Sequence, residues 1–316
     1  MTLLFTADWH IKLGQKNVPR EWAIERYYEF FNQIYTLEKE VDAHIIGGDI
    51  FDRIPTMEEL GLYFEFVTNC EIPTYIYDGN HEATKKGQTF LSNLALATNK
   101  VNPLVQIITI PKKDMILGNM KFNLLPYCEL HNDLAIEKMN PILPLFTHVR
   151  GEIPPHVKPE IPLSKLAKFP VVFAGDLHSH SNCQRNIVYP GSPMTTTFHR
   201  TKVSTGYIII YEDWDWTWGE FDLPQLLRKK VKSTKEMVPG KRDHIIYEIE
   251  GDIDELAKVE HNELLDKKIV KRQMEAALIL DKSMTIEEEL TEYLLYILEI
   301  PEERVTEIVG TFHDYA

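Results

Sequence analysis

The chain has 316 residues, 44% of them hydrophobic, which is enough for one large domain with a hydrophobic core and a smaller domain appended to it. Its formal net charge of -14 excludes a protein that binds nucleic acid over its whole surface. If the protein does bind nucleic acid, bound metal ions or a partner would have to attract the phosphates. No apolar run approaches the roughly 20 residues that span a bilayer, so we expect no membrane contact.

The N-terminal segment and the cysteines both bear on location. The first residues turn polar after Phe5, which is typical of a buried strand and not of a signal peptide. Cys70, Cys128 and Cys183 are widely spaced, which excludes a CxxC metal or redox site and indicates reduced thiols. We therefore expect a cytoplasmic protein.

Strands and helices alternate over the first hundred residues. Each short apolar run with strand character is followed by apolar residues at helical spacing. The expected elements are strands at 3–5, 43–46 and 74–77 and helices at 22–37, 57–67 and 89–97. This βαβαβ order predicts a parallel sheet with right-handed crossovers.

Beyond residue 100 the pattern changes to short strands. The expected ones are a meander over 105–110 and 115–125 with Gly118-Asn119 as its turn, strands ending at Phe146 and Ala174, one near Val188 and one at 206–211. Trp214, Trp216 and Trp218 alternate with polar residues, which predicts an aromatic strand face packed on the core rather than a platform for stacking bases. Residues 1–225 thus predict an α/β fold, a two-sheet sandwich flanked by helices.

A change of composition at Gln225 marks the edge of this domain and predicts a linker. The elements expected after it are a strand at 244–249, a helix at 252–259, a strand at 268–272 and two terminal helices at 285–298 and 301–309. Thr285 is a good N-cap, with Glu288 three residues on. We expect three parts, at 1–225, 226–282 and 283–316.

Residues that suit metal ions follow five of the predicted strands. The motifs are Asp8-x-His10, Gly48-Asp49-Ile50-Phe51-Asp52, Asp78-Gly79-Asn80-His81-Glu82, Thr147-His148 and Gly175-Asp176-Leu177-His178-Ser179-His180. Ligands of open α/β sheets bind just beyond the carboxyl ends of strands. Each motif alone is usually structural, but their joint occurrence after strands predicts one shared metal site.

The residue types indicate the chemistry of that site. A carboxylate shared by two divalent cations holds them close enough to clamp one phosphoryl group. Imidazole, carboxylate and amide oxygen together suit manganese, iron or zinc better than a pure oxygen cage would. Glycines before Asp49 and Asn80 let the chain turn sharply, so that both side chains can enter one pocket.

In this order, the five motifs resemble the D-x-H, G-D-x-x-D, G-N-H-D/E, lone-His and G-H-x-H blocks of the calcineurin-like metallophosphoesterases. Gly48 to Arg53 and Tyr189 to Pro193 further resemble the SbcD-type nucleases, the bacterial and phage relatives of the double-strand-break repair nuclease. A compact chain of this kind is most similar to a phage recombination nuclease subunit. The resemblance implies a phosphoesterase nuclease domain over 1–225, a capping domain over 226–282 that helps to admit DNA, and a cytoplasmic location in a bacterial or phage-infected cell.

The resemblance also implies a role for each residue of the motifs. The implied roles are Asp8 and His10 as ligands of a first metal ion, Asp49 as the bridge, Asn80 and His148 as ligands of a second ion, His81 as the catalytic histidine, and Asp52 as a residue that orients the ligands or helps to hold Arg53. Two divalent ions are implied, with Mn²⁺ expected.

One motif departs from the family pattern. Where the family has G-H-x-H, this chain has Gly175-Asp176-Leu177-His178-Ser179-His180. If the glycine sets the register, Asp176 and His178 are the ligands; if the His-x-His pair sets it, His178 and His180 are. We favour the glycine register, because strand ends determine geometry and aspartate binds hard cations.

The resemblance favours a two-metal DNA phosphodiesterase, an exonuclease or endonuclease subunit in DNA repair, recombination or phage DNA metabolism. Its implied partners are DNA and an SbcC-type coiled-coil ATPase, with a homodimer also open. The basic segments 228–232 and 241–242 could contact phosphates or be a solvated linker. The terminal helices could dock on the ATPase or pack on the protein itself. Two alternatives stay open: another phosphoesterase, such as a protein phosphatase or cyclic-nucleotide phosphodiesterase, and a metal-free scaffold on the same fold.

Overall fold

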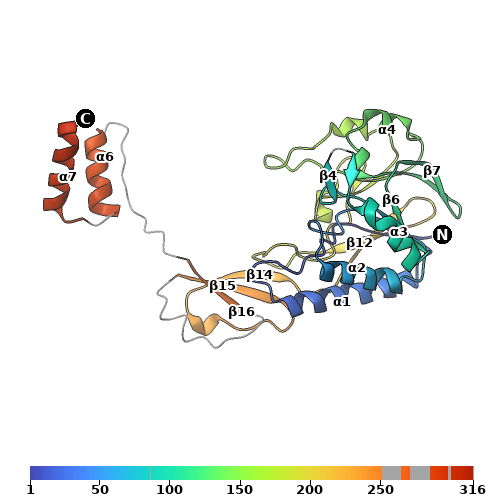
Figure 1. The fold of residues 1–316 in the computed structure, drawn as a ribbon, viewed down its shortest axis with the longest axis horizontal. Helices are drawn as coiled ribbons and strands as arrows, with labels where there is room; N and C mark the ends of the chain where they lie inside the picture. Colours follow the sequence, from blue (N-terminus) through green and yellow to red (C-terminus); the bar gives the residue numbers. More distant parts are fainter. Residues whose placement is uncertain (86, 251–264, 271–284, 298–299, 316) are drawn as a thin grey trace.

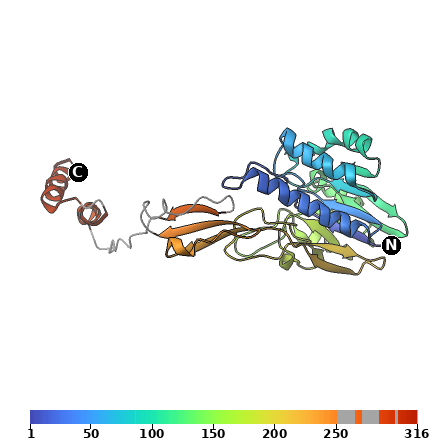
Figure 2. The ribbon, with the colours of Figure 1, turned by 90° about the horizontal axis from the view of Figure 1, so that it is seen from below.

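The computed structural model describes residues 1–85, 87–250, 265–270, 285–297 and 300–315. Its main body holds two sheets that lie face to face (Figures 1 and 2). The first sheet has the strand order β13-β12-β1-β2-β3-β6, with β1 (Leu3–Thr6), β2 (Ala43–Gly47), β3 (Thr74–Tyr77), β6 (Val105–Ile108), β12 (Gly206–Ile210) and β13 (Trp216–Glu220). The second has the order β11-β10-β9-β8-β7, with β7 (Lys112–Leu117), β8 (Met120–Leu125), β9 (Leu145–His148), β10 (Val172–Gly175) and β11 (Ile187–Val188).

Helices cover the outer faces of this sandwich. Packing against the first sheet are α1 (Arg20–Glu38), α2 (Met57–Asn69) and α3 (Leu91–Val101), and against the second is α4 (Asp133–Lys138). The shorter elements are the hairpin β4 (Ala83–Lys85) and β5 (Gln88–Thr89) and the 3-10 turns η1 (Tyr127–Glu129), η2 (Leu163–Lys165), η3 (His180–Asn182) and η4 (Thr234–Glu236).

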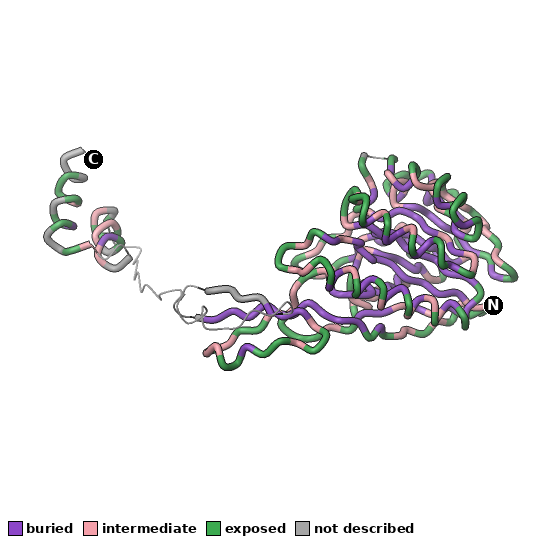
Figure 3. Tube along the Cα trace, turned by 60° about the horizontal axis from the view of Figure 1, so that its bottom comes forward, coloured by how far each residue is buried: buried purple, intermediate pink, exposed green. Residues whose placement is uncertain are grey.

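The alternation of side chains along β1 places its residues in two different cores. Leu3 and Phe5 belong to the cluster between the sheets, where Phe5 meets Phe146 of β9 edge-on at 5.4 Å. Leu4 points the other way, into the cluster beneath the helices. Both faces of the first sheet are therefore buried, as Figure 3 shows for the strands of the body.

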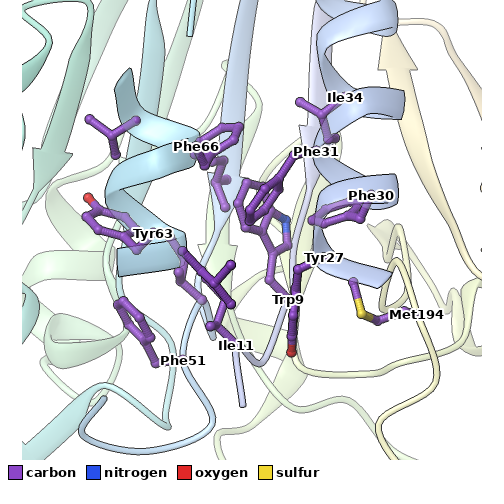
Figure 4. Close-up of a cluster of buried hydrophobic side chains, with 14 of the residues drawn as sticks. Trp9, Ile11, Tyr27, Phe30, Phe31, Ile34, Phe51, Tyr63, Phe66 and Met194 are labelled. Carbon is purple, nitrogen blue, oxygen red and sulfur yellow. The ribbon is translucent and has the colours of Figure 1, made fainter. Parts of the chain in front are cut away.

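Trp9 anchors the loop that follows β1. Its indole ring is fully buried and meets Phe30 of α1 at 4.9 Å and Phe66 of α2 at 4.7 Å, both edge to face (Figure 4). The indole N–H donates to the Thr6 hydroxyl at 3.0 Å, which satisfies its one polar atom. This packing holds the backbone between Asp8 and His10, so the aromatic core positions both motif residues.

The sheet topology confirms the parallel βαβαβ unit, since β1, β2 and β3 pair in parallel. The turn at Gly118-Asn119 is confirmed between the antiparallel strands β7 and β8. The expected meander is wrong in one respect: β6 pairs in parallel with β3 in the first sheet instead of joining β7. The helix α3 between β3 and β6 explains this, because such a crossover returns the chain parallel to the same sheet.

The three tryptophans near β13 pack against the core, as the alternation predicted. Trp214, Trp216 and Trp218 are partly buried against the cluster between the sheets. Thr217, between two of them, is exposed on the other face. β13 pairs antiparallel with β12 at the edge of the first sheet. The tryptophans therefore extend the hydrophobic core between the two sheets as far as the edge strand β13.

A small parallel sheet follows, with β14 (Leu226–Val231), β15 (His244–Glu250) and β16 (Leu265–Val270). The linker expected after Gln225 begins instead with β14, because it pairs with β15 along its whole length. The strand expected at 244–249 is confirmed, and that at 268–272 begins earlier, at Leu265, and is described to Val270. The helix expected at 252–259 lies outside the described residues.

The domain edge near Gln225 stays a prediction. Neighbouring residues at this edge pack into two different hydrophobic clusters. Leu226 belongs to the core beneath α1 and α2, whereas Leu227 belongs to the cluster of the small sheet. Contacts cross the edge: the Trp22 indole donates to the Arg242 carbonyl at 2.9 Å, and the His244 ring lies 2.6 Å from the Asn17 carbonyl. The small sheet thus abuts the start of α1 (Figure 1).

Two helices form the last described part of the chain. α6 (Ile286–Glu292) begins with the predicted capping box of Thr285 and Glu288, runs into a π-helical segment, η5 (Tyr293–Ile297), and is followed by α7 (Glu302–Tyr315). Leu294 and Val305 are buried, and α6 and α7 contact each other. Within the described ranges, every helix is too short or too polar to span a membrane.

Candidate metal centre

The predicted ligands come together at the carboxyl ends of strands from both sheets. Asp8 follows β1, Asp49 follows β2, Asn80 follows β3, and Asp176 follows β10, while His148 is the last residue of β9. The loops after β1 and β2 continue side by side, because the His10 N–H donates to the Asp49 carbonyl at 2.9 Å. One centre is thus assembled from segments far apart in the sequence: the Asp176 N–H donates to the Asp8 carboxylate across 168 residues.

An unusual backbone conformation directs these side chains toward the centre. Asp8, His10, Asp49 and Asp176 have φ values of 58°, 45°, 53° and 102°, in the left-handed region that residues other than glycine seldom adopt. Strain of this kind costs about 1–3 kcal/mol per residue and persists where the surrounding structure imposes it. Its concentration at the four aspartate and histidine positions is typical of a functional site.

Glycine is required where the loops touch. A side chain at Gly79 would collide with the Asp49 carboxylate, and one at Gly48, where φ is 86°, would lie 2.7 Å from the His148 ring. The absence of side chains therefore lets the loops after β2 and β3 close on the same small volume.

One group of potential ligands consists of Asp8, His10 and His178, whose ligand atoms all lie within 4.8 Å of one another. The Nε2 atoms of His10 and His178 are 3.0 Å apart. Burial lowers the pKa of both rings; neighbouring histidines lower each further, and for His178 the carboxylates of Asp49 and Asp176 oppose the shift without reversing it. Neutral rings at this separation present lone pairs to one point, which is the geometry that a cation needs.

A second group surrounds His148. Its Nδ1 lies 2.8 Å from the Gly47 carbonyl and so carries the proton that it donates there, which leaves the Nε2 lone pair facing the centre. That Nε2 lies 3.0 Å from the Asn80 amide oxygen and 3.8 Å from Asp176 Oδ1. An imidazole, an amide oxygen and a carboxylate therefore converge on one point.

Asp49 lies between the two groups. Its Oδ2 is 3.7 Å from His10 Nε2 and 3.5 Å from His148 Nε2. Its other oxygen, Oδ1, accepts a hydrogen bond from the backbone N–H of His81 at 2.9 Å, which orients the carboxylate. This is the position that a bridging ligand would occupy.

The buried carboxylates of the centre shift the pKa values of one another and of His148. Burial raises the pKa of Asp8 well above its usual range, and Asp49 and Asp176 add repulsion. Burial opposes charge on His148, but the carboxylates of Asp49, Asp8 and Asp176 outweigh it and raise the His148 pKa to about 9. The donor set fits divalent metal ions, whose positive charge would keep His148 neutral with its Nε2 lone pair toward the centre.

His81 lies at the mouth of the centre and is 36% exposed. Its Nδ1 is 2.6 Å from the Asp52 carbonyl, so that Nε2 faces inward, 3.9 Å from Asp49 Oδ2. Its ring packs edge-on against His10 with 4.7 Å between centroids. A histidine held in this way can exchange a proton with a bound substrate.

Asp52 and Arg53 form separate ion pairs, so the expectation that Asp52 helps to hold Arg53 is corrected. Asp52 pairs with Lys12 Nζ at 2.7 Å and lies 3.9 Å from His10 Nδ1. Arg53 instead donates to both oxygens of the buried Glu59 carboxylate. The chain turns between these two residues, so their side chains meet different neighbours.

Sequence reasoning missed Glu82, which supports two of the ligand loops. Its buried carboxylate accepts the N–H groups of Asp49 at 2.9 Å, Gly79 at 2.8 Å and Phe51 at 2.9 Å. Burial, and then the nearby Asp49, raise its pKa to about 8. Its place at the end of the Gly-Asn-His-Glu motif was a signal that could have identified it.

The structure places Asp176 and His180 of the departing motif in different surroundings. Asp176 lies beside His148, and its outer oxygen is 3.3 Å from Arg150 Nε, a residue that sequence reasoning missed. His180 packs elsewhere: its ring stacks on Trp218 with 5.2 Å between centroids, and its Nδ1 lies 2.7 Å from the Tyr189 carbonyl. The arrangement favours Asp176 and His178 as the ligand pair, which stays a prediction.

Comparisons with known proteins identify the family of the chain. Residues 1–161 match the family model described as calcineurin-like phosphoesterase. The chain is 42% identical over 282 residues to a protein of Escherichia phage T5 named "Probable exonuclease subunit 1", covering 85% of this chain and 84% of that one. It is 26% identical to a protein of Invertebrate iridescent virus 6 named as a phosphoesterase, over 83% of this chain and 98% of that one. A crystal structure from Thermus thermophilus aligns with a TM-score of 0.42 and 11% identity, over 69% of this chain and 98% of that one.

Proposed function

The chain belongs to the calcineurin-like phosphoesterase family, and from this membership we propose that it is a two-metal DNA phosphodiesterase, the nuclease subunit of a larger assembly. The observation that supports this most strongly is the Asp49 carboxylate, which lies between one group of donors around His10 and another around His148. A shared carboxylate between two donor groups is what a pair of metal ions requires.

In the proposed site, each side chain has a distinct task. Asp8, His10 and His178 would hold one ion; Asn80, His148 and Asp176 would hold the other; and Asp49 would serve both. Mixed nitrogen and oxygen donors suit Mn²⁺. Two such ions, when bound, would activate water and neutralise charge on the phosphoryl group.

His81 would complete the reaction. With Nδ1 donating to the Asp52 carbonyl, a doubly protonated ring would carry its second proton on Nε2, which faces the centre. That proton can pass to the leaving oxygen as the phosphodiester bond breaks.

DNA is proposed as the substrate from the SbcD-like motifs and from the name of the T5 relative. Of the basic residues considered for phosphate contacts, Arg228 and Arg242 are engaged with acidic neighbours, Arg228 with Glu248 and Arg242 with Asp222 and Glu29. Lys229, Lys230 and Lys232 are exposed and remain candidates.

An SbcC-type ATPase is proposed as the partner. The T5 relative is named as a subunit, and the terminal helices of this chain are required by none of the metal-binding motifs. Leu290 of α6 is partly buried, and Leu294 of η5 is buried. The side chain of Ile297 is not described, and Leu298 lies outside the described residues. These helices are the proposed docking element.

Incubating the pure protein with end-labelled duplex and single-stranded DNA and Mn²⁺, with and without the ATPase, tests the proposal. We expect metal-dependent cleavage that an Asp49→Ala variant lacks. A chain that hydrolyses phosphopeptides or cyclic nucleotides rapidly but leaves DNA intact would instead be a phosphatase or cyclic-nucleotide phosphodiesterase. A chain that binds no metal would be a scaffold.

A further inference from the structure

A cavity of about 630 Å³ lies at the edge of the first sheet opposite the metal centre. It is formed between α1 and α2, which lie side by side (Figure 1), and is bordered by the segments that lead into β2 and β3. The metal ligands follow the carboxyl ends of these parallel strands, so the cavity, at their amino ends, is a separate space. Its volume is within the range of about 300–1,000 Å³ that small-molecule sites occupy.

The lining of this cavity carries an excess of negative charge. Glu38, Glu65 and Glu71 contribute to it, whereas Lys39 is its one basic residue among those described. The helices α1 and α2 both end at the cavity without a basic residue in the last turn. The partial negative charge of two helix C-termini therefore adds to that of the carboxylates. Together these charges favour a cationic ligand.

Glu38 presents one carboxylate oxygen to the cavity. Its side chain is only 3% exposed, and its Oε1 lies 3.1 Å from His44 Nδ1. His44 Nε2 lies 2.8 Å from the Thr6 hydroxyl, which accepts the indole N–H of Trp9 at 3.0 Å. The Thr6 hydroxyl can therefore donate to His44 Nε2, and the Nδ1–H of His44 then donates to Glu38. This buried series orients Glu38 and leaves Oε2, which has no hydrogen-bond partner within the described ranges, for a ligand.

A second polar group of the lining also lacks a partner. The hydroxyl of Tyr35 is buried and has no hydrogen-bond partner among the described residues. The Tyr35 ring is held in place by stacking on Phe66 of α2, with 6.1 Å between centroids and 7° between planes. Buried polar groups are nearly always paired in native proteins, so two unpaired oxygens beside one cavity indicate a ligand that donates N–H groups.

The spacing of the carboxylates distinguishes an extended organic cation from a metal ion. Ligand atoms of a metal ion converge on one point, and the described residues form three such groups, all at the metal centre. The three glutamates of the cavity form none, so their charges are too far apart to share one ion. Tyr28 and Ile72, both partly exposed, add apolar surface to the lining. Separate carboxylates beside apolar surface suit ammonium groups joined by methylene chains.

We propose that this cavity binds a linear polyamine, with one ammonium group at Glu38 Oε2 and the others beside Glu65 and Glu71. The site is separate from the metal centre, and the inference does not rest on the proposed function. A bound polyamine would neutralise the negative charge at the ends of two helices and so stabilise the folded chain.

Calorimetric titration with spermidine tests the proposal, in about 0.15 M NaCl to screen unspecific attraction to the acidic chain and with Mn²⁺ present to fill the metal centre. We expect one spermidine per chain. The double variant Glu65→Gln/Glu71→Gln should weaken binding at least about tenfold, and both positions are exposed, so neutral side chains of the same shape preserve the fold. The control Glu25→Gln/Glu220→Gln removes the same charge from exposed positions outside the lining and should bind within about twofold of wild type.

Asn69→Arg provides a further variant, because this exposed lining residue would place a tethered cation in the cavity and compete with spermidine. Thermal unfolding gives a second measurement: spermidine should raise Tm of the wild type and of the control, and raise it less in the cavity variants. Absence of binding at this ionic strength, or equal weakening in the cavity variants and the control, would overturn the inference. Displacement of spermidine by an equal concentration of Mg²⁺ would also overturn it, since it would assign the cavity to a metal ion.

Discussion

Replacing Asp176 and His180 by alanine, one at a time, should separate metal binding from structural stability. The Asp176 side chain lies beside His148, but its contact with Asp8 is made by its backbone N–H at 3.0 Å, which alanine retains. Asp176→Ala should therefore keep the loop in place and lose a metal ligand. Arg150 would lose its acidic partner at the same time.

The expected magnitudes differ in kind between the two variants. A carboxylate about 4 Å from a cation contributes about 4 kcal/mol per unit charge at an effective dielectric constant near 20, so with a divalent ion Asp176→Ala should weaken one metal site by at least about a thousandfold. His180→Ala loses a ring stacked on Trp218 and a hydrogen bond to the Tyr189 carbonyl, together about 2 kcal/mol. That loss lowers Tm by about 5 °C and leaves metal binding intact.

Metal content after dialysis against micromolar Mn²⁺, together with thermal unfolding of each variant, provides the assay. Asp176→Ala should retain one ion per chain where the wild type retains two, and His180→Ala should retain both but unfold earlier. Asp176→Asn, which keeps an oxygen donor without the charge, should fall between Asp176→Ala and wild type. If His180→Ala loses a metal ion while Asp176→Ala keeps both, the glycine register is wrong and His178 and His180 form the ligand pair.

Three further outcomes are expected. His81→Ala should lower the rate of DNA cleavage by about 10²–10⁴ with metal content unchanged, and cleavage at the normal rate would exclude its proposed role. Glu82→Ala should lower the free energy of unfolding by about 3–6 kcal/mol, because three buried N–H groups lose their acceptor; denaturant unfolding beside an exposed Glu58→Ala control measures this, and equal stability would contradict it. Truncation before Thr285 should weaken association with the ATPase partner in a pull-down, and undiminished binding would assign the terminal helices a structural role.

The fold of the body was largely predictable, because its signals are local. Short apolar runs marked β1, β2 and β3, and helical spacing marked α1 and α2 to within a few residues. The assignment of β6 failed because the pairing partner of a strand is not written in its own residues. The strand beginning at Leu226 was missed for a related reason: its exposed basic residues resemble a linker, and only pairing with β15 makes the segment a strand.

The sequence by itself determined which residue types stand at the strand ends, since a sharp turn after a buried strand needs glycine and a metal site needs carboxylate and imidazole. Only the tertiary structure decided which of these meet. His10 faces His178 across 168 residues of sequence, Asp176 lies beside His148 while His180 stacks on Trp218, and Glu82 ties two loops together through their N–H groups. The physical reason is that ligand geometry depends on distances of a few ångströms between strand ends, which strand order and core packing determine and local patterns do not.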